Sequence, residues 1–391
     1  MNKPDEGPQI KYTDRLKEVA WLFLKLGATA FGGPAAYIAM MQRETVRQRR
    51  WIDDQQFLDL TGALNLIPGP NATETALYLG LKRARWPGFL AAGLLFILPA
   101  TLATMLLAWI YVRYGSLPQV GWVLYGIKPV VIAIILQALW DLGRTGVKGI
   151  ATGIIGIAVI VLYLLGLNEI LLLFGGAAVM LLIYAICKYG KRTTAAVIAL
   201  PLFKIPLAAL AAGATPISNW GIFLSFLKIG SLLFGGGYVL LAFLKSEFEV
   251  RLGWLTNQQL LDAIAAGQIT PGPVSSSATF VGYLLGGWPA ALLATLGMFL
   301  PSFILIALLA RFLPLFRKSP WAGAFLDGVN ISALGLMAGV TILLGQAAII
   351  DWFTIVLALI AVFLVFRFKF SSAWLILGGG VVGVVYKMIV G

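Results

Sequence analysis

Residues 23–34 read FLKLGATAFGGP and residues 226–237 read FLKIGSLLFGGG, so one short pattern occurs twice, 203 residues apart. The shift brings these positions together: Lys25 with Lys228, Trp51 with Trp254, Pro68-Gly69-Pro70 with Pro271-Gly272-Pro273 and, after the loss of one residue from the register, Gly126 with Gly328. An ordered match of this length predicts two homologous halves. We place them at residues 12–190 and 216–391, joined by a linker at 191–215.

The composition is that of a membrane protein. Of 391 residues, 60% are hydrophobic and 12% are charged, and the mean hydropathy is +0.92. A soluble domain could not bury so much apolar surface, so we predict an all-α polytopic membrane protein. The formal charge of +13 is spread in short clusters between apolar segments, which indicates membrane topology and not nucleic-acid binding.

The sequence contains few of the residues that enzymes use for catalysis. The chain has no histidine, which excludes Ser-His pairs, His-rich zinc sites and histidine proton relays. The single cysteine, Cys187, excludes an internal disulfide and a cysteine-cluster metal site. We therefore expect a protein that is not an enzyme and has no cofactor or metal. The polar start, MNKPDEGPQIKY, is unlike a cleavable signal peptide.

Five apolar runs in each half are long enough to predict membrane spans. They cover 16–40, 88–112, 120–140, 149–166 and 169–187, and then 220–244, 289–310, 322–345, 351–366 and 373–390. Between the first two runs of each half, two short apolar pieces meet at Pro-Gly-Pro, in 55–84 and 258–283. Because proline ends a helix, we predict a re-entrant helical hairpin in each half.

Basic residues predict the orientation. Clusters at 43–50 and 82–85 flank the first hairpin, and the positive-inside rule places both in the cytoplasm. Five crossings per half would invert the second half relative to the first and leave both termini outside. Inverted repeats are a device of secondary transporters. The apolar stretch 195–213 would add a crossing, but its two prolines and Lys204 favour a linker at the membrane interface.

Lys25 and Lys228 lie near the middle of their predicted spans. A lysine at that depth costs about 2.5 to 3.5 kcal/mol and normally faces a cavity or a partner. Snorkelling to the interface would explain one such lysine, but its recurrence favours a binding role. The glycines that follow interrupt each span, either as a kink or as a site of close packing; they are Gly32, Gly33, Gly235 and Gly236.

After each Pro-Gly-Pro a short helix begins with its free N–H groups in the membrane centre. Such an end binds anions, and inversion would bring the two ends together. The candidate substrate-binding residues here are Gly69, Asn71, Thr73, Gly272, Ser275, Ser276 and Ser277. The alternative is that these side chains only cap their own helices. Accessory candidates are Glu74 as a proton carrier or a structural ion-pair partner, and Lys128 with its equivalent Asn330 as polar contacts.

Two long strings resemble the chromate ion transporter family. The first runs FGGPAAYIAMMQRETVRQRRWIDDQQFLDLTGALNLIPGPNATETALYLG and is followed by WPGFLAAGLLFILP; the second begins FGGGYVLLAFLKSEFEVRLGWLTNQQ and includes ITPGPVSSSATFVGYLLGGWP. The resemblance covers most of the chain and implies a two-domain member in a bacterial or archaeal inner membrane that exports chromate. Many members carry a histidine where this chain has Tyr37.

The leading hypothesis is a secondary active transporter of a tetrahedral divalent oxyanion, namely chromate efflux by alternating access. A sulfate importer or exchanger is the first alternative, because sulfate has the same charge and shape. An anion channel or a non-transporting membrane scaffold is the second. The expected partners are the oxyanion, the lipid bilayer and, as a further candidate, a second copy of the chain, with no nucleic acid.

Overall fold

The computed structural model describes residues 11–31, 33–65, 67–189, 216–234, 237–310, 319–368 and 370–390. Every regular element in these ranges is a helix, which confirms the predicted all-α class. The first half has α1 (Tyr12–Thr29), α2 (Gly33–Gln42), the π-helix η1 (Arg43–Gln48), α3 (Asp54–Leu64), α4 (Asn71–Tyr114), α5 (Pro118–Gly146), α6 (Ile150–Leu164) and α7 (Glu169–Tyr189).

The second half follows the same order. It has α9 (Asn219–Leu232), the 3₁₀ turn η4 (Gly237–Val239), α10 (Leu240–Leu244), the π-helix η5 (Lys245–Arg251), α11 (Asn257–Ile269), the 3₁₀ turn η6 (Val274–Ser276), α12 (Ser277–Leu309), α14 (Pro320–Ala348), α15 (Trp352–Phe368) and α16 (Ser372–Val390). The linker at 191–215, including the stretch 195–213, lies outside the described residues, as do Gly32, Gly235 and Gly236.

Six of these segments are long and apolar enough to cross a membrane: α4, α5, α7, η6 with α12, α14 and α16. The shorter helices α6 and α15 are also apolar. Large apolar side chains project outward from them, such as Leu94 and Leu359, with 58% and 64% of their surface exposed. In a bilayer this exposure is favourable, since lipid tails are the solvent for these faces. The protein is therefore a multi-pass membrane protein.

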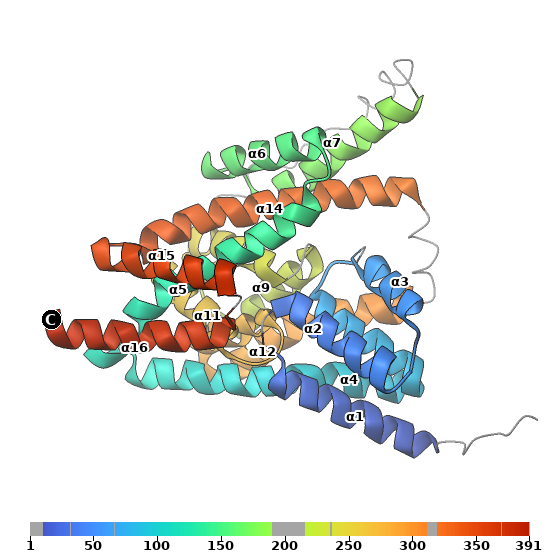
Figure 1. Cartoon of the computed structure of the whole chain (residues 1–391), viewed down its shortest axis with the longest axis horizontal. Helices are drawn as coiled ribbons and strands as arrows, with labels where there is room; N and C mark the ends of the chain where they lie inside the picture. The colour runs from blue at the N-terminus through green and yellow to red at the C-terminus, as the bar shows by residue number, and fades with distance from the viewer. Residues whose placement is uncertain are drawn as a thin grey trace, which may run out of the picture.

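The first predicted span of each half is wrong, because the chain turns back at the glycines. The ammonium of Lys25 lies 3.2 Å from Glu44 Oε1, although 19 residues of one continuous helix would separate them by about 28 Å. Gly33 has a φ of 81°, a value that favours glycine, and it starts α2 after the break. α1 and α2 therefore lie side by side as a hairpin (Figure 1).

The second half repeats this turn. Lys228 Nζ lies 2.8 Å from Glu247 Oε2, and the rings of Phe226 and Phe248 have centroids 4.9 Å apart. Residues 16–40 and 220–244 are therefore helical hairpins. Among the described residues, the apolar helices that correspond to predicted spans are then α4, α5, α6 and α7 in the first half and α12, α14, α15 and α16 in the second, four in each half in place of five.

The start of α1 lies beside a kink in α4. Ala84 and Arg85 have non-helical dihedral angles, and the Tyr12 hydroxyl donates a hydrogen bond of 2.9 Å to the carbonyl of Ala84. We call this end of the molecule, on the right in Figure 1, the α3 end, and the opposite end, where α16 finishes, the α11 end. The described N-terminal helix starts at the α3 end and the C-terminal helix finishes at the α11 end. The two described ends of the chain therefore lie at opposite ends of the molecule, which differs from the predicted placement of both termini on one side.

The halves are interlocked. α6 and α7 pack against α14 of the second half, while α15 and α16 pack against α5 of the first. Equivalent glycines allow this close approach: a Cβ on Gly126 would lie 2.0 Å from the carbonyl oxygen of Gly379, and one on Gly328 would lie 2.5 Å from Ala177 Cα. α4 also packs against α12, so equivalent helices meet in the middle of the molecule.

Candidate functional site

Four breaks in helices meet in the middle of the molecule. The Gly69 N–H donates a 2.8 Å hydrogen bond to the carbonyl of Leu233, and the Gly272 N–H donates one of 2.9 Å to the carbonyl of Ala30. These are equivalent pairs, so each Pro-Gly-Pro turn is attached to the glycine break of the other half. We call the described residues of these four breaks, 30–33, 65–74, 233–237 and 270–277, the central junction.

The backbone of this junction requires glycine at positions 69 and 272. Their φ angles are 147° and 91°, a region that other residues rarely adopt. A Cβ on Gly69 would lie 2.2 Å from both Glu74 Oε1 and Ser302 Oγ, and one on Gly272 would lie 2.8 Å from Ala100 Cβ. Both predicted glycines therefore lie in the junction, where they shape the turn.

Gly69→Ala should destabilise the protein by about 1 to 3 kcal/mol from the backbone strain alone, and the clash with Glu74 and Ser302 adds to this. Thermal unfolding of the purified chain in detergent measures the effect. The control is Gly175→Ala in α7, where the helix is regular and nothing lies within 4 Å of the new Cβ. Equal melting temperatures for the two variants would show that Gly69 is not under this constraint.

No side chain caps either helix that starts at the junction. Pro70 and Pro273 are the N-cap residues of α4 and η6, and neither offers a side-chain acceptor. The Asn71 amide instead donates to Asn65 Oδ1 at 2.7 Å, and the Ser277 hydroxyl donates to the carbonyl of Val274 at 2.9 Å. Neither Asn71 nor Ser277 therefore accepts a recorded hydrogen bond from a backbone N–H at the start of its own helix in the described part of the chain.

Two more hydroxyls at these helix starts lack a partner. Thr73 Oγ1 and Ser275 Oγ are buried and have no hydrogen-bond partner in the described part of the chain. Ser276 differs, because the Thr104 hydroxyl donates to it at 3.2 Å. The junction therefore offers uncapped helix starts and unsatisfied hydroxyls, which is the donor set that an oxyanion needs.

Glu74 is a buried carboxyl group that forms no ion pair within the residues that the structure describes. Its side chain is completely buried, Oε1 accepts a 3.3 Å hydrogen bond from Ser302, and Oε2 has no partner among the described residues. The positions equivalent to Glu74 and Ser302 hold Ser277 and Ala100, so the acidic group occurs on one side of the junction only. Of the two readings for Glu74, the structural ion pair with a lysine is not observed.

The two lysines do not present free charges. Lys25 and Lys228 each pair with a buried glutamate of their own half, Glu44 and Glu247, whose side chains are 3% exposed. An arginine contacts each glutamate as well: Arg49 contacts Glu44, and Arg251 Nε lies 2.8 Å from Glu247 Oε2. In the Lys228 cluster two cations meet one carboxylate. In the Lys25 cluster Arg49 also lies 3.5 Å from Glu18, which pairs with Arg83, so three cations meet two carboxylates. Each cluster has a formal net charge of +1.

Our sequence reasoning missed the two glutamates. Glu44 and Glu247 lie 203 residues apart, so the shift that pairs the lysines also pairs their carboxylates. The lysines keep 47% and 35% of their side-chain surface exposed, so each side chain is only partly buried by its ion pair.

The equivalent helices α3 and α11 lie in different surroundings. α11 packs against α4, α5, α12, α14 and α16 and is buried from Leu260 to Gln268, whereas the extensive packing of α3 is with α4. Leu261 of α11 has no exposed surface, while its equivalent Leu58 is 56% exposed. Figure 1 places α11 in the interior and α3 at the edge. Two helices of related sequence thus occupy a closed and an open position.

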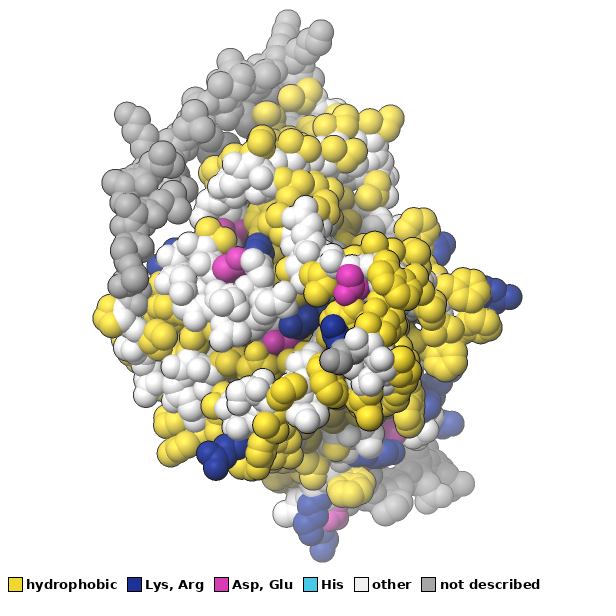
Figure 2. Space-filling model, turned by 90° about the vertical axis from the view of Figure 1, so that its left-hand side faces the viewer, with side chains coloured by type: hydrophobic (Ala, Val, Ile, Leu, Met, Phe, Trp, Pro, Cys, Tyr) yellow, Lys and Arg dark blue, Asp and Glu magenta, His cyan; other side chains and the backbone are white. Residues whose placement is uncertain are grey.

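A polar cluster holds α11 against both halves. Lys128 Nζ of α5 lies 3.2 Å from Asp262 Oδ1 and 2.5 Å from Gln258 Oε1. The Tyr111 hydroxyl donates to Asp262 Oδ2 at 2.9 Å, and Gln258 Nε2 donates to the Ala347 carbonyl of α14 at 3.0 Å. We call these five residues the Lys128 cluster. Figure 2 shows the α11 end, where charged side chains gather near the middle of an otherwise largely apolar face.

At the α3 end, the positions equivalent to Lys128 and Ala347 line a cavity, which we call the α3 pocket. Its volume is about 270 Å³, and its polar lining consists of Asn65, Asn71, Thr145, Lys148, Asp327 and Asn330. Asn330 and Thr145 are the equivalents of Lys128 and Ala347, which Gln258 bridges at the other end. The molecule is therefore closed at the α11 end and open to a polar pocket at the α3 end. The pocket contains the predicted residues Asn71 and Asn330, but Lys128 belongs to the closed cluster.

Comparison with known proteins gives consistent matches. The family model described as chromate transporter matches residues 17–182 and 220–384. A chromate transport protein of Cupriavidus metallidurans is 32% identical over 95% of this chain and 94% of its own length. A probable chromate transport protein of Synechococcus elongatus is 33% identical over 88% of both chains, and a chromate transport protein of Pseudomonas aeruginosa is 33% identical over 92% of this chain and 90% of its own. No solved structure matches the chain significantly.

Proposed function

The chain belongs to the chromate transporter family, and on this premise we propose that it exports chromate across the cytoplasmic membrane as a secondary active transporter. Chromate is a tetrahedral dianion. The proposed mechanism is alternating access between two inverted halves, each with a re-entrant hairpin, 55–84 or 258–283, whose first arm is α3 or α11.

The unequal surroundings of α3 and α11 carry this proposal. Two segments of related sequence can each take either position, so exchanging their positions would produce a second state that is open at the α11 end and closed at the α3 end. Such a pair of states opens one binding site to the two sides of the membrane in turn. A channel needs no such pair, because it is open to both sides at once.

Charge supports the orientation. The basic clusters at 43–50 and 82–85 flank α3 and the kink of α4, and the positive-inside rule places the α3 end in the cytoplasm. The described state would then receive anions from the cytoplasm through the α3 pocket. In this orientation the start of α1 is cytoplasmic and the end of α16 is external.

We assign the oxyanion to the central junction. The uncapped starts of α4 and η6 would donate backbone N–H groups, and the hydroxyls of Thr73 and Ser275 would donate to further oxygens. The lysine clusters around Lys25 and Lys228 would attract the anion along the path from each end, since each has excess positive charge. Glu74 is the candidate proton carrier next to this site.

Replacement of Lys25 by methionine tests this role. In proteoliposomes the variant should transport radiolabelled chromate about tenfold more slowly, if the ammonium lowers the barrier for the anion by about 1.4 kcal/mol. The control is Lys17→Met, which removes an exposed lysine from the same helix. Equal rates for two folded variants would contradict a role for Lys25 in transport.

The same vesicles separate the alternative functions. Unlabelled chromate on the far side should accelerate uptake, because an alternating-access carrier returns loaded, whereas a channel would give no such exchange. Unlabelled sulfate in excess tests the first alternative, because sulfate has the same charge and shape as chromate. Equal competition by the two anions would make sulfate a second substrate.

A further inference from the structure

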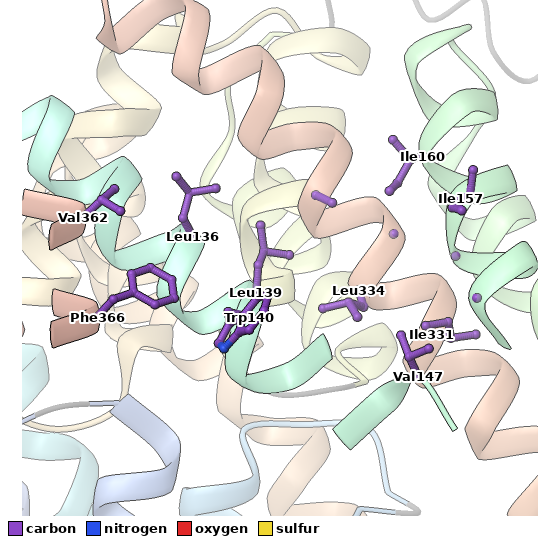
Figure 3. A pocket seen from close by; sticks show the side chains of 14 residues that line it. Leu136, Leu139, Trp140, Val147, Ile157, Ile160, Ile331, Leu334, Val362 and Phe366 are labelled. Carbon is purple, nitrogen blue, oxygen red and sulfur yellow. The ribbon is translucent and has the colours of Figure 1, made fainter. Parts of the chain in front are cut away.

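A second, larger cavity lies between α5, α6, α14 and α15, away from the central junction. Its volume is about 700 Å³, within the range of small-molecule sites. Figure 3 shows its apolar lining, which includes Leu139 and Trp140 of α5, Ile157 and Ile160 of α6, and Val362 and Phe366 of α15. Ile160 and Val362 are equivalent positions in the two halves, so the cavity lies where the halves cross.

We propose that this cavity holds an acyl chain of an anionic phospholipid from the leaflet at the α3 end. All four walls are apolar helices of a membrane protein. A dry cavity of this size would forfeit dispersion contacts, and water would find no polar partners in it. A hydrocarbon chain from the surrounding bilayer fills it without either cost.

The polar side chains at one margin point to a phosphate headgroup. The Trp140 ring lies edge-on to Phe366, with centroids 6.3 Å apart, at the cavity wall. Arg144 follows Trp140 by one helical turn of α5, and Arg367 directly follows Phe366 on α15. Both helices run toward the α3 end, so the two arginines lie on that side of the cavity. Tryptophan and arginine are the residues that meet lipid headgroups at a membrane interface.

These arginines are available to a ligand. Arg144 is exposed, and neither Arg144 nor Arg367 forms an ion pair within the described part of the chain. Arg367 contacts the ring of Phe368, 5.6 Å from the centroid, which leaves its guanidinium edge free to meet a phosphate.

The other margin lacks this chemistry. The positions equivalent to Arg144 and Arg367 hold Gln346 and Leu165, and Ile342 stands in place of Trp140. Two pairs of equivalent positions line the cavity, Leu136 with Ala338 and Ile160 with Val362, but the charges at its rim have no equivalents. The recognition of an anionic headgroup is therefore confined to one leaflet, the cytoplasmic one if the proposed orientation holds.

Native mass spectrometry of the full chain tests the site, with phosphatidylglycerol and phosphatidylcholine added to the detergent in turn. We expect retention of at least one phosphatidylglycerol per chain in the wild type. Arg144→Gln with Arg367→Gln should weaken that retention about 25-fold, since each arginine contributes about fivefold toward an anionic lipid. Arg113→Gln, an exposed arginine at the other end of the molecule, is the control.

A second variant tests the acyl chain. Gly153 lines the cavity and has room for a side chain, because its added Cβ would meet only Val147 at 3.9 Å. Gly153→Phe should fill the cavity and release both lipids, while Gly175→Phe on α7, which faces open space, should release neither. Unchanged lipid retention in both Gly153→Phe and the double arginine variant would overturn the proposal. So would a lipid-free dimer of the wild type that Gly153→Phe dissociates. The readout is lipid retention, so its failure would leave the transport proposal unaffected.

Discussion

Lys128→Met is expected to destabilise the protein by about 3 kcal/mol, because it leaves the buried carboxylate of Asp262 without its cation. The side chain of Asp262 is 3% exposed and that of Lys128 is 15% exposed, so water cannot replace the lost partner easily. The hydrogen bond from Tyr111 remains, but it does not neutralise the charge. The measurement is the melting temperature of the purified chain in detergent.

Two controls separate the ion pair from the packing of the lysine stem. Asn330→Met changes the equivalent position, which lines the open α3 pocket and forms no ion pair, and should alter stability by less than about 0.5 kcal/mol. Adding Asp262→Asn to Lys128→Met should restore most of the loss, because an amide is far cheaper to bury than an unpaired carboxylate. A similar loss in Lys128→Met and Asn330→Met would contradict this account of the Lys128 cluster.

The sequence repeat identified the recurrent Pro-Gly-Pro and Phe-Gly-Gly segments of the central junction, whereas hydropathy did not predict the path of the chain through them. Pairing positions 203 residues apart brought Pro-Gly-Pro and Phe-Gly-Gly together as recurrent features, and the structure joins them through Gly69 and Gly272. Proline and glycine also predicted where helices end, because both act on the local backbone.

The direction of the chain after Phe-Gly-Gly could not be read from hydropathy. An apolar run of about 25 residues has the same composition whether it crosses the membrane or turns back. The decisive signal was a charge pair, since Lys25 and Glu44 recur as Lys228 and Glu247. Two opposite charges 19 residues apart in a single helix would lie about 28 Å apart, so their contact shows the turn.

The sequence could not predict which end is open and which is closed, for a different reason. Leu58 and Leu261 are the same residue in equivalent places, yet one is exposed and the other is buried. A sequence that supports two states specifies both, so it cannot say which one a structure will contain. The interlocking of α6 and α7 with α14 likewise depends on pairings between helices far apart in the chain.

Cysteines at positions 258 and 347 should cross-link and stop transport almost completely. Gln258 Nε2 lies 3.0 Å from the Ala347 carbonyl, so a short bifunctional maleimide should join α11 to α14 and hold the α11 end closed. The natural Cys187 is exposed and is first replaced by serine. Chromate uptake into proteoliposomes before and after treatment measures the loss, and each single cysteine variant is its own control.

The equivalent pair, cysteines at positions 55 and 145, distinguishes alternating access from a fixed structure. Gln55 and Thr145 correspond to Gln258 and Ala347, but they are exposed and Thr145 lines the open α3 pocket. We expect little cross-linking of this pair in the absence of chromate and strong cross-linking during turnover, because the opposite state would bring α3 against the end of α5 as α11 now lies against α14. A pair at 55 and 145 that never cross-links during measurable transport would rule out the exchange of α3 and α11 between open and closed positions.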